Sequence, residues 1–401
     1  MTTSHSSDSS ARWRALSIAA LLLALGCWLA IGALRARDTY LTRGIPTGLP
    51  EPIADGGARL GVNVYLQDAS PAEIEAALDE ISANRITYVK QPFFYSAAFD
   101  WGQADRLVAA AAAKGLTLVP LLDGDPANQF APPDVGHFAG WAGEFARRYG
   151  ASISHYIIWD EPNLAGHWGN TPANPAAYAA LLSAAAETIR TVDSDAVIVA
   201  APLAPTTETG PDNLAEPLFL QALYEAGAAE AFDVVAAKPY GFDTGSDDRA
   251  VDIDHLNFSR VILLREMMLA QGDSGTPIWA GNWGWNSLPP DWAGRPSIWG
   301  QATEQQQADQ TVAALERARR EWPWAGVMFL ENWQPGAPAD DPRWGFSIAG
   351  RPTAAALADY LTAQPSDVAM PGFDPAGPDN PAQQFSGTWE FSPQFGADIG
   401  Q

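Results

Sequence analysis

The sequence predicts an α/β protein, a (β/α)8 TIM barrel of parallel strands preceded by one N-terminal transmembrane helix. From residue 59 onward, short apolar runs alternate eight times with amphipathic stretches over about 300 residues, the repeat number and length of such a barrel. These apolar runs are continuous, as in parallel strands that are buried on both faces. An open doubly wound sheet is disfavoured, because no G-x-G-x-x-G follows the first run.

The N-terminal segment is identified by its length. Ala15 to Leu34 form 20 residues without a charge, enough to cross a hydrocarbon core of about 30 Å. Because a signal peptide has an apolar stretch of about 7–15 residues, a retained anchor is favoured. A signal cleaved near Ala33 or Ala36 is the alternative. The expected organisation is a polar tail, an anchor, a linker, a barrel and a Pro- and Gly-rich tail, at residues 1–14, 15–34, 35–58, 59–362 and 363–401.

The net charge and the few Cys and His residues restrict which molecules the chain is expected to bind. The chain has 401 residues and a net charge of −24, so a nucleic-acid partner is not expected, because phosphate binding needs clustered Lys and Arg. The first 44 residues carry +3 and the remainder −27, which fits an extracytoplasmic domain held at the membrane by its anchor. Cys27 is the single cysteine, and the five His lack the H-E-x-x-H spacing. No metal or other cofactor is therefore expected.

Each strand and helix has its own signal. Continuous apolar runs predict strands at 60–65, 86–90, 116–122, 153–159, 196–201, 232–237, 277–280 and 326–330. Amphipathic stretches predict helices at 71–83, 101–114, 135–149, 175–192, 217–226, 256–271, 303–322 and 353–361. Ser70 and Glu73 have the spacing of a capping box at the first of these helices. Gly115 is placed to end the second.

Polar and aromatic residues gather where the predicted strands end. In a barrel these ends meet at one face and build the active site. Four tryptophans lie there, Trp159, Trp283, Trp285 and Trp333. Flat aromatic faces pack against the C–H faces of sugars, so at least two are expected to line a sugar-binding cleft. Packing in the core is the alternative.

The fourth strand carries the most specific motif. The sequence Tyr-Ile-Ile-Trp-Asp-Glu-Pro-Asn-Leu at 156–164 resembles the fourth strand of clan A glycoside hydrolases, the retaining cellulase-, xylosidase- and iduronidase-like barrels. The resemblance covers most of residues 59–362. It implies that Glu161 is the general acid/base, which needs a raised pKa to hold its proton. Asn163 belongs to the same motif and is expected to contact substrate.

Later landmarks follow the order of the same family, with three departures. Residues 232–241 resemble its sixth strand, where Tyr240 corresponds to a tyrosine near the nucleophile, and residues 276–286 resemble its seventh. Asn282 falls where the family has its nucleophilic Glu, and Lys238 where it has His. Asp160 replaces the Asn that holds the sugar 2-hydroxyl. Asp160 would raise the pKa of Glu161, and Lys238 would lower it if it reaches inward.

Two interpretations of Asn282 remain open. In one, another carboxylate replaces the missing Glu: Glu331 at the end of the eighth strand, or Asp123 or Asp125 at the end of the third. A carboxyl pair about 6.5–9.5 Å apart would then invert the anomeric centre. In the other, the barrel binds carbohydrate without hydrolysing it.

The resulting prediction is a membrane-anchored glycosidase that acts on an extracellular or cell-envelope polysaccharide. The predicted catalytic residues are Glu161 and Glu331. The residues expected to contact substrate are Lys90, Asp123, Asp160, Asn163, Lys238, Tyr240, Asn282, Trp283, Trp285 and Trp333. The acidic domain suits neutral glycans, since anionic ones would need Lys90 and Lys238 in the cleft. The strand-like segment at 385–392 resembles the start of a β-sandwich accessory domain; packing on the barrel is the alternative.

Overall fold

The computed structural model describes residues 6–46 and 53–363. The predicted strand at 385–392 and most of the predicted C-terminal tail lie outside these ranges. The chain divides into two units, residues 1–45 and 46–401. In the first, helix α1 (Ser6–Thr42) continues past the predicted span, through Arg35 and Arg37. By length and composition it is able to cross a membrane, a test that a signal sequence near the N-terminus also passes.

The second unit is an eight-stranded parallel barrel over the described residues. Its strands are β1 (Arg59–Asn63), β2 (Tyr88–Phe94), β3 (Thr117–Asp123), β4 (His155–Ile158), β5 (Val197–Ala200), β6 (Val235–Ala237), β7 (Ile278–Trp283) and β8 (Ala325–Leu330). They are ordered β5-β4-β3-β2-β1-β8-β7-β6. Parallel bridges from Val199 to Val234 and from Leu203 to Ala237 nearly close the ring. The predicted (β/α)8 fold is confirmed.

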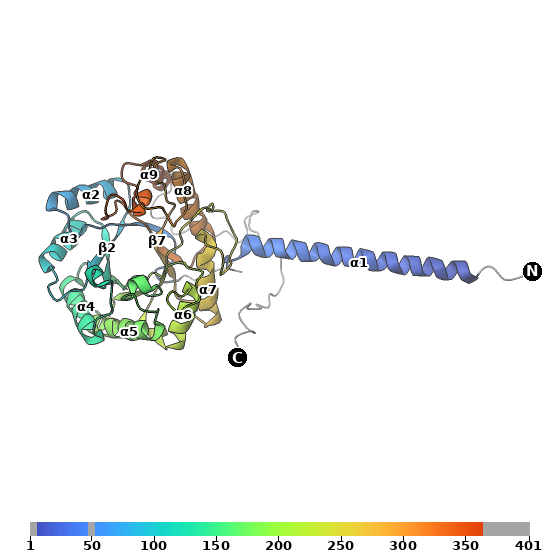
Figure 1. Cartoon of the computed structure of the whole chain (residues 1–401), viewed down its shortest axis with the longest axis horizontal. Coiled ribbons are helices and arrows are strands. Elements are labelled where there is room, and N and C mark those ends of the chain that lie inside the picture. Colours follow the sequence, from blue (N-terminus) through green and yellow to red (C-terminus); the bar gives the residue numbers. More distant parts are fainter. Residues whose placement is uncertain (1–5, 47–52, 364–401) are drawn as a thin grey trace, which may run out of the picture. The chain divides into compact units, whose positions relative to one another are not determined.

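The helices surround the strands (Figure 1). They are α2 (Pro71–Ala83), α3 (Trp101–Ala113), α4 (Val135–Tyr149), α5 (Pro175–Val192), α6 (Glu216–Glu225), α7 (Val261–Ala270), α8 (Glu304–Glu321) and α9 (Pro352–Ala363). The predicted capping box is present, with Ser70 and Glu73 bonded to each other's backbone N–H. Gly115 ends α3 with a φ of +68°, a conformation that favours glycine.

Two strands run several residues further than the sequence predicts. β2 continues through Pro92 to Phe94, since its pairing with β3 is kept on both sides of the proline. β7 continues past Ala280 to Trp283, with register shifts against β8. Because side chains alternate along a strand, this extension sends Asn282 and Trp283 to opposite faces of the sheet.

The interior of the barrel is filled at one level by apolar side chains. This cluster contains Val119, Leu121, Ile157, Val199, Val234, Ala236, Trp279, Val327 and Phe329. A larger apolar cluster of buried residues from the strands and helices makes up the rest of the core. Beyond the apolar interior, toward the carboxyl ends of the strands, the inward-facing residues become polar, and there the candidate site begins.

Candidate active site

The chain leaves β4 through a backbone turn that is unusual for its residue types. Trp159 has a φ of +71° and Glu161 a φ of +44°, in the left-handed region that residues with a side chain seldom occupy. The Trp159 N–H donates to the Leu122 carbonyl at 2.8 Å, and the Glu161 N–H to the Pro202 carbonyl at 3.2 Å. The neighbouring chains thus hold a strained turn, which is a common feature of functional sites.

Lys238 joins the two acidic residues of this turn. Its Nζ lies 2.9 Å from Asp160 Oδ2 and 2.8 Å from Glu161 Oε1. The side chain of Lys238 is 4% exposed, against 14% and 17% for the two carboxylates. Burial alone would lower the pKa of Lys238, but the carboxylates outweigh burial and raise it far above its ordinary value. Lys238 therefore remains a cation inside the barrel mouth, as the inward-reaching orientation predicts.

His167 contacts the other oxygen of Glu161. Its Nδ1 lies 3.0 Å from Glu161 Oε2. Its ring stacks on Phe130, with centroids 4.1 Å apart, and its carbonyl accepts the Trp159 indole N–H at 3.0 Å. Burial lowers the pKa of His167, but Glu161 outweighs burial and raises it. The imidazolium form is thus favoured beside Glu161.

These contacts correct the expected state of Glu161. Burial raises the pKa of its carboxyl, but Lys238 and then His167 outweigh burial and lower it well below its usual range. A general acid is expected to have a raised pKa, so that it holds a proton. In the structure two cations flank the group and keep it ionised, because an opposite charge at hydrogen-bond distance favours the charged form.

Asn282 joins a second buried network. The Lys90 Nζ donates to Asn282 Oδ1 at 2.9 Å, and Asn282 Nδ2 donates to Glu331 Oε2 at 2.7 Å. The Tyr240 hydroxyl donates to the same Glu331 oxygen at 2.6 Å. All four side chains are buried. An amide suits this position because it accepts from Lys90 on one side and donates to Glu331 on the other.

Burial changes the protonation of this second network. It lowers the pKa of the Lys90 ammonium to about 8 and raises that of the Glu331 carboxyl, against the opposing effect of Lys238. It also raises the pKa of Tyr240 well above its ordinary value, with Glu331 and Glu161 contributing. Since Lys238 and Tyr240 each feel both Glu161 and Glu331, the two networks form one electrostatic cluster.

Asp123 is the last residue of β3 and is 2% exposed. One of its oxygens accepts the Gly124 N–H at 2.8 Å. Burial, followed by the charge of Asp160, raises the pKa of its carboxyl to about 7. In the described part of the chain, Asp123, Asp160 and His167 form the group that is near enough to hold a metal ion, with one ligand atom from each within 4.8 Å of the others.

Asn163 is bonded to the backbone of two neighbouring loops, and its predicted contact with substrate stays a prediction. Its Nδ2 donates to the carbonyls of Ala204 and Leu214 at 2.8 and 2.9 Å, and its Oδ1 accepts the Ala204 N–H at 2.9 Å. It is fully buried. These three bonds occupy its hydrogen-bonding groups and tie the loop after β4 to the loop after β5.

Three of the four tryptophans pack against residues of the surrounding helices and loops. Trp283 and Trp285 are buried against Phe258, which leads into α7. Trp159 packs on Phe138 of α4 and on Trp168. These contacts favour the interpretation of the three side chains as core residues, and their contact with substrate stays a prediction. Trp333 at the end of β8 is buried too, and its contact with substrate stays a prediction.

Phe130 is part of the site, although no sequence pattern points to it. It lies in the loop after β3 with a φ of +53°, and no motif or strand boundary indicates that its ring covers His167. The left-handed backbone at Phe130 marks the residue as unusual, but this conformation is visible only in the structure.

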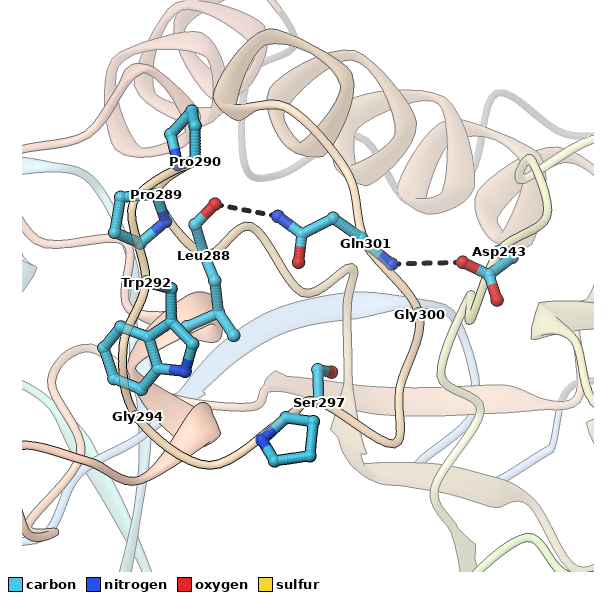
Figure 2. Close-up of a pocket in the computed structure, with 10 residues that line it drawn as sticks. Asp243, Leu288, Pro289, Pro290, Trp292, Gly294, Ser297, Gly300 and Gln301 are labelled. Atoms are coloured by element: carbon cyan, nitrogen blue, oxygen red, sulfur yellow. Dashed lines mark hydrogen bonds between the residues drawn. The ribbon is translucent and has the colours of Figure 1, made fainter.

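A separate pocket of about 600 Å³ lies in the loop after β7. It is lined by residues of 288–301 and by Asp243, with Trp292 on its wall (Figure 2). The Gln301 amide donates to the Leu288 carbonyl, and its backbone N–H to Asp243, closing one side of the pocket. None of the predicted site residues lines it, so it is distinct from the polar cluster.

Comparisons with known proteins identify the fold. No family model matches the chain, and no curated protein matches it in sequence. Three similar solved structures are a β-xylosidase from Caulobacter crescentus CB15, a glucosidase from Croceicoccus marinus and an endo-1,4-β-mannanase from Rhizomucor miehei. Their identities are 19%, 16% and 14%, and their TM-scores 0.52, 0.57 and 0.51. The matches cover 80%, 79% and 80% of this chain, and 70%, 69% and 98% of the respective neighbours.

These three neighbours share one fold with the chain. The chain has the (β/α)8 barrel fold of glycoside hydrolases, as the sequence resemblance implies. At these identities the likeness concerns the fold, and function has to be argued from the site.

Proposed function

We propose that this protein is a membrane-anchored glycoside hydrolase that acts on O-glycosidic bonds of an extracellular or cell-envelope polysaccharide. Glu161 is its general acid/base. One observation carries the proposal: Glu161 lies in the turn that follows β4 of a glycoside-hydrolase-like barrel, held between Lys238 and His167 at hydrogen-bond distance. A carboxyl group on a strained turn at the carboxyl end of a barrel strand has the position of a catalytic residue.

Glu161 needs a proton source, because its own pKa is lowered. Lys238 is nearer, at 2.8 Å, but its raised pKa means that it keeps its proton. The source is therefore the imidazolium of His167, whose Nδ1 is 3.0 Å from Glu161 Oε2. In the proposed step the leaving oxygen takes a proton from Glu161, and Glu161 takes one from His167. His167 regains its proton from solvent. General acid catalysis of this kind accelerates a reaction by about 10²–10⁴-fold.

Glu331 is the proposed second carboxylate. Tyr240 and Asn282 both donate to its Oε2, and within the described residues no hydrogen bond reaches Oε1. That oxygen is available to take a proton from water. Glu331 would then act as the base that directs water to the anomeric carbon, which gives inversion. Asn282 orients Glu331 in this scheme and forms no covalent intermediate.

The anchoring part of the proposal rests on helix α1. Its length and composition fit a membrane span, and the acidic remainder of the chain suits a domain outside the cytoplasm. Membrane fractionation tests this part: a retained anchor leaves the full-length chain in the membrane pellet after a carbonate wash, whereas a cleaved signal releases a shorter chain.

The hydrolase proposal is tested by the release of reducing ends from a panel of polysaccharides. We expect turnover of at least one of them, and a loss of about 100-fold or more in Glu161→Gln. Glu187→Gln is the matched control, since Glu187 is exposed on α5, and it should keep full activity. The absence of turnover across the panel, or an unchanged rate in Glu161→Gln, would contradict the proposal.

Binding of carbohydrate without hydrolysis is the second candidate function, and Asn282 is the observation that favours it. An amide cannot form the glycosyl-enzyme intermediate of a retaining enzyme. The test compares Asn282→Glu with Asn282→Gln, which has the same length but no charge. Turnover that appears in the Glu variant alone, with glycan binding in the unaltered protein, would support a silenced barrel.

A further inference from the structure

Asp123 and Asp160 present hydrogen-bond acceptors that the described residues leave unfilled. The second oxygen of Asp123 accepts no hydrogen bond within the described ranges and keeps some exposure to solvent, although the residue as a whole is 2% exposed. Asp160 Oδ1 is buried and also lacks a partner, while Oδ2 is bonded to Lys238. A buried acceptor without a partner destabilises the protein, so Asp160 Oδ1 points to a ligand. The accessible oxygen of Asp123 is near enough to serve as a second acceptor for the same ligand.

The chemistry of the pair restricts that ligand. Burial and the charge of Asp160 raise the pKa of Asp123 to about 7, so a bound cation is what would hold both carboxyls ionised. An ionised carboxylate only accepts hydrogen bonds, so a ligand that suits the ionised pair must donate. The two lysines at the mouth are already bonded, Lys238 to Asp160 and Glu161, and Lys90 to Asn282. They are not free to receive an anionic sugar. The ligand is therefore a donor and carries no negative charge at this place.

We propose that Asp123 and Asp160 bind the ammonium group of an amino sugar, so that the substrate is a glycan with free amino groups. An ammonium offers three donors and a positive charge, whereas a sugar hydroxyl offers one donor. A divalent metal ion fits less well. The Lys238 ammonium, 2.9 Å from Asp160 Oδ2, and the neighbouring His167 imidazolium both repel a double charge more strongly than a single one. The inference rests on the proposed function as far as cleavage is concerned; binding is independent of it.

The test measures binding of monosaccharides, which removes any dependence on linkage. Glucosamine and galactosamine are compared with glucose, galactose and the two N-acetylated amino sugars. Ligand-observed NMR is recorded on the full chain in detergent at pH 7 with EDTA. We expect at least one free amine to bind ~10-fold more tightly than its hydroxyl and N-acetyl counterparts, the gain from a charge-assisted hydrogen bond.

Variants assign the preference to the pair. Asp123→Asn and Asp160→Asn should each remove it, and the second serves if the first fails to fold. Asp125→Asn is the matched control: Asp125 lies two residues from Asp123, and its oxygen caps the next turn by accepting the Ala127 N–H, a role that Asn fills equally well. The control should keep the preference.

The outcomes separate this inference from the proposed function. Equal or undetectable binding of amines and hydroxyl sugars, or a preference that survives both Asn variants, overturns it. The inference is also overturned if Zn²⁺ or Ca²⁺ stabilises the protein against unfolding, this effect requires Asp123, and no amine preference exists. Glu161-dependent cleavage of neutral glycans without an amine preference overturns this inference and leaves the hydrolase proposal intact. An amine preference without any cleavage supports this inference and contradicts the hydrolase proposal.

Discussion

Lys238 Nζ lies 2.8 Å from Glu161 Oε1, inside the mouth of the barrel. The same ammonium lies 2.9 Å from Asp160 Oδ2, so one buried cation compensates two neighbouring carboxylates. Removing one partner from a buried ion pair leaves an uncompensated charge, which is more damaging than losing an exposed pair. This makes the stability of the barrel sensitive to Lys238 and gives the site a defined charge at neutral pH.

The first prediction concerns the stability that Lys238 provides. Lys238→Met should lower the free energy of unfolding at pH 7 by about 3–5 kcal/mol. Because the pKa of Glu161 is lowered in the folded state, its stabilising effect is present above the unfolded pKa of about 4.3 and is lost as the pH falls. The deficit of the variant should therefore shrink on acidification. Urea unfolding of the full chain in detergent, followed by tryptophan fluorescence, measures it.

Lys114→Met is the matched control for this prediction. Lys114 also contacts two carboxylates, those of Glu75 and Asp79, but these are 50% and 61% exposed. Exposed pairs contribute little, so the control should unfold close to the unaltered protein. An equal loss of unfolding free energy in the two variants would show that burial gives the Lys238 ion pairs no greater effect on stability than exposed pairs have.

The second prediction concerns the pH dependence of catalysis. Glu161 raises the pKa of His167, so the rate should fall on the alkaline side above the ordinary His value of about 6.5, as the imidazolium is lost. His167→Gln should reduce kcat at neutral pH by about 10²-fold. It should also move the optimum to lower pH, because Glu161 then has to bind its own proton. The pH profile of kcat/KM measures both effects.

His137→Gln serves as the control for His167. His137 is exposed near the start of α4, so its replacement should leave the profile unchanged. An alkaline limb that persists in His167→Gln would assign the proton donor to another group.

The third prediction concerns Lys90. Burial lowers the pKa of its ammonium to about 8, against about 10.4 for an unfolded chain. Between these values the unfolded state binds more protons, so this group makes the protein more stable as the pH rises, by up to ~3 kcal/mol. Lys90→Met should lack this contribution. The difference in unfolding free energy between variant and unaltered protein at pH 7.5 and at pH 10 isolates it, and an identical difference at both would refute it.

Most of the fold follows from the sequence because burial is encoded locally. Each parallel strand lies between two apolar layers and therefore appears as a continuous apolar run, and each helix has its own stripe and caps. The least accurate boundaries have physical causes. Pro92 interrupts the strand pattern of β2 without breaking its pairing with β3, and β7 keeps pairing past Ala280 through register shifts that no periodicity reveals.

The site was less predictable, since its contacts join distant segments. The motif after β4 draws attention to Asp160 and Glu161. The two departures from the family pattern, Lys238 and Asn282, bond to the carboxylates of the cluster: Lys238 to Asp160 and Glu161, and Asn282 to Glu331. Asn163 carries the same motif, yet its partners Ala204 and Leu214 lie on a loop some 40–50 residues away. Whether a polar residue at a strand end meets substrate or a neighbouring loop depends on such contacts, which a sequence without coordinates does not contain.

The last prediction tests Glu331 as the base through its hydrogen-bond donor. The Tyr240 hydroxyl lies 2.6 Å from Glu331 Oε2 and opposes the rise in the pKa of that carboxyl caused by burial. Tyr240→Phe removes this donor, so the pKa should rise further, by about 1–2 units for a hydrogen bond to a charged group. Less of Glu331 is then ionised at a given pH, and the acid limb of kcat/KM should move to higher pH by the same amount. Tyr224→Phe is the matched control, because its hydroxyl is also 2.6 Å from a carboxylate, that of Asp273, but lies on α6 outside the site. If both variants keep the acid limb where it is, Glu331 is not the base and the water must be activated by another carboxylate, with Asp123 the next to test.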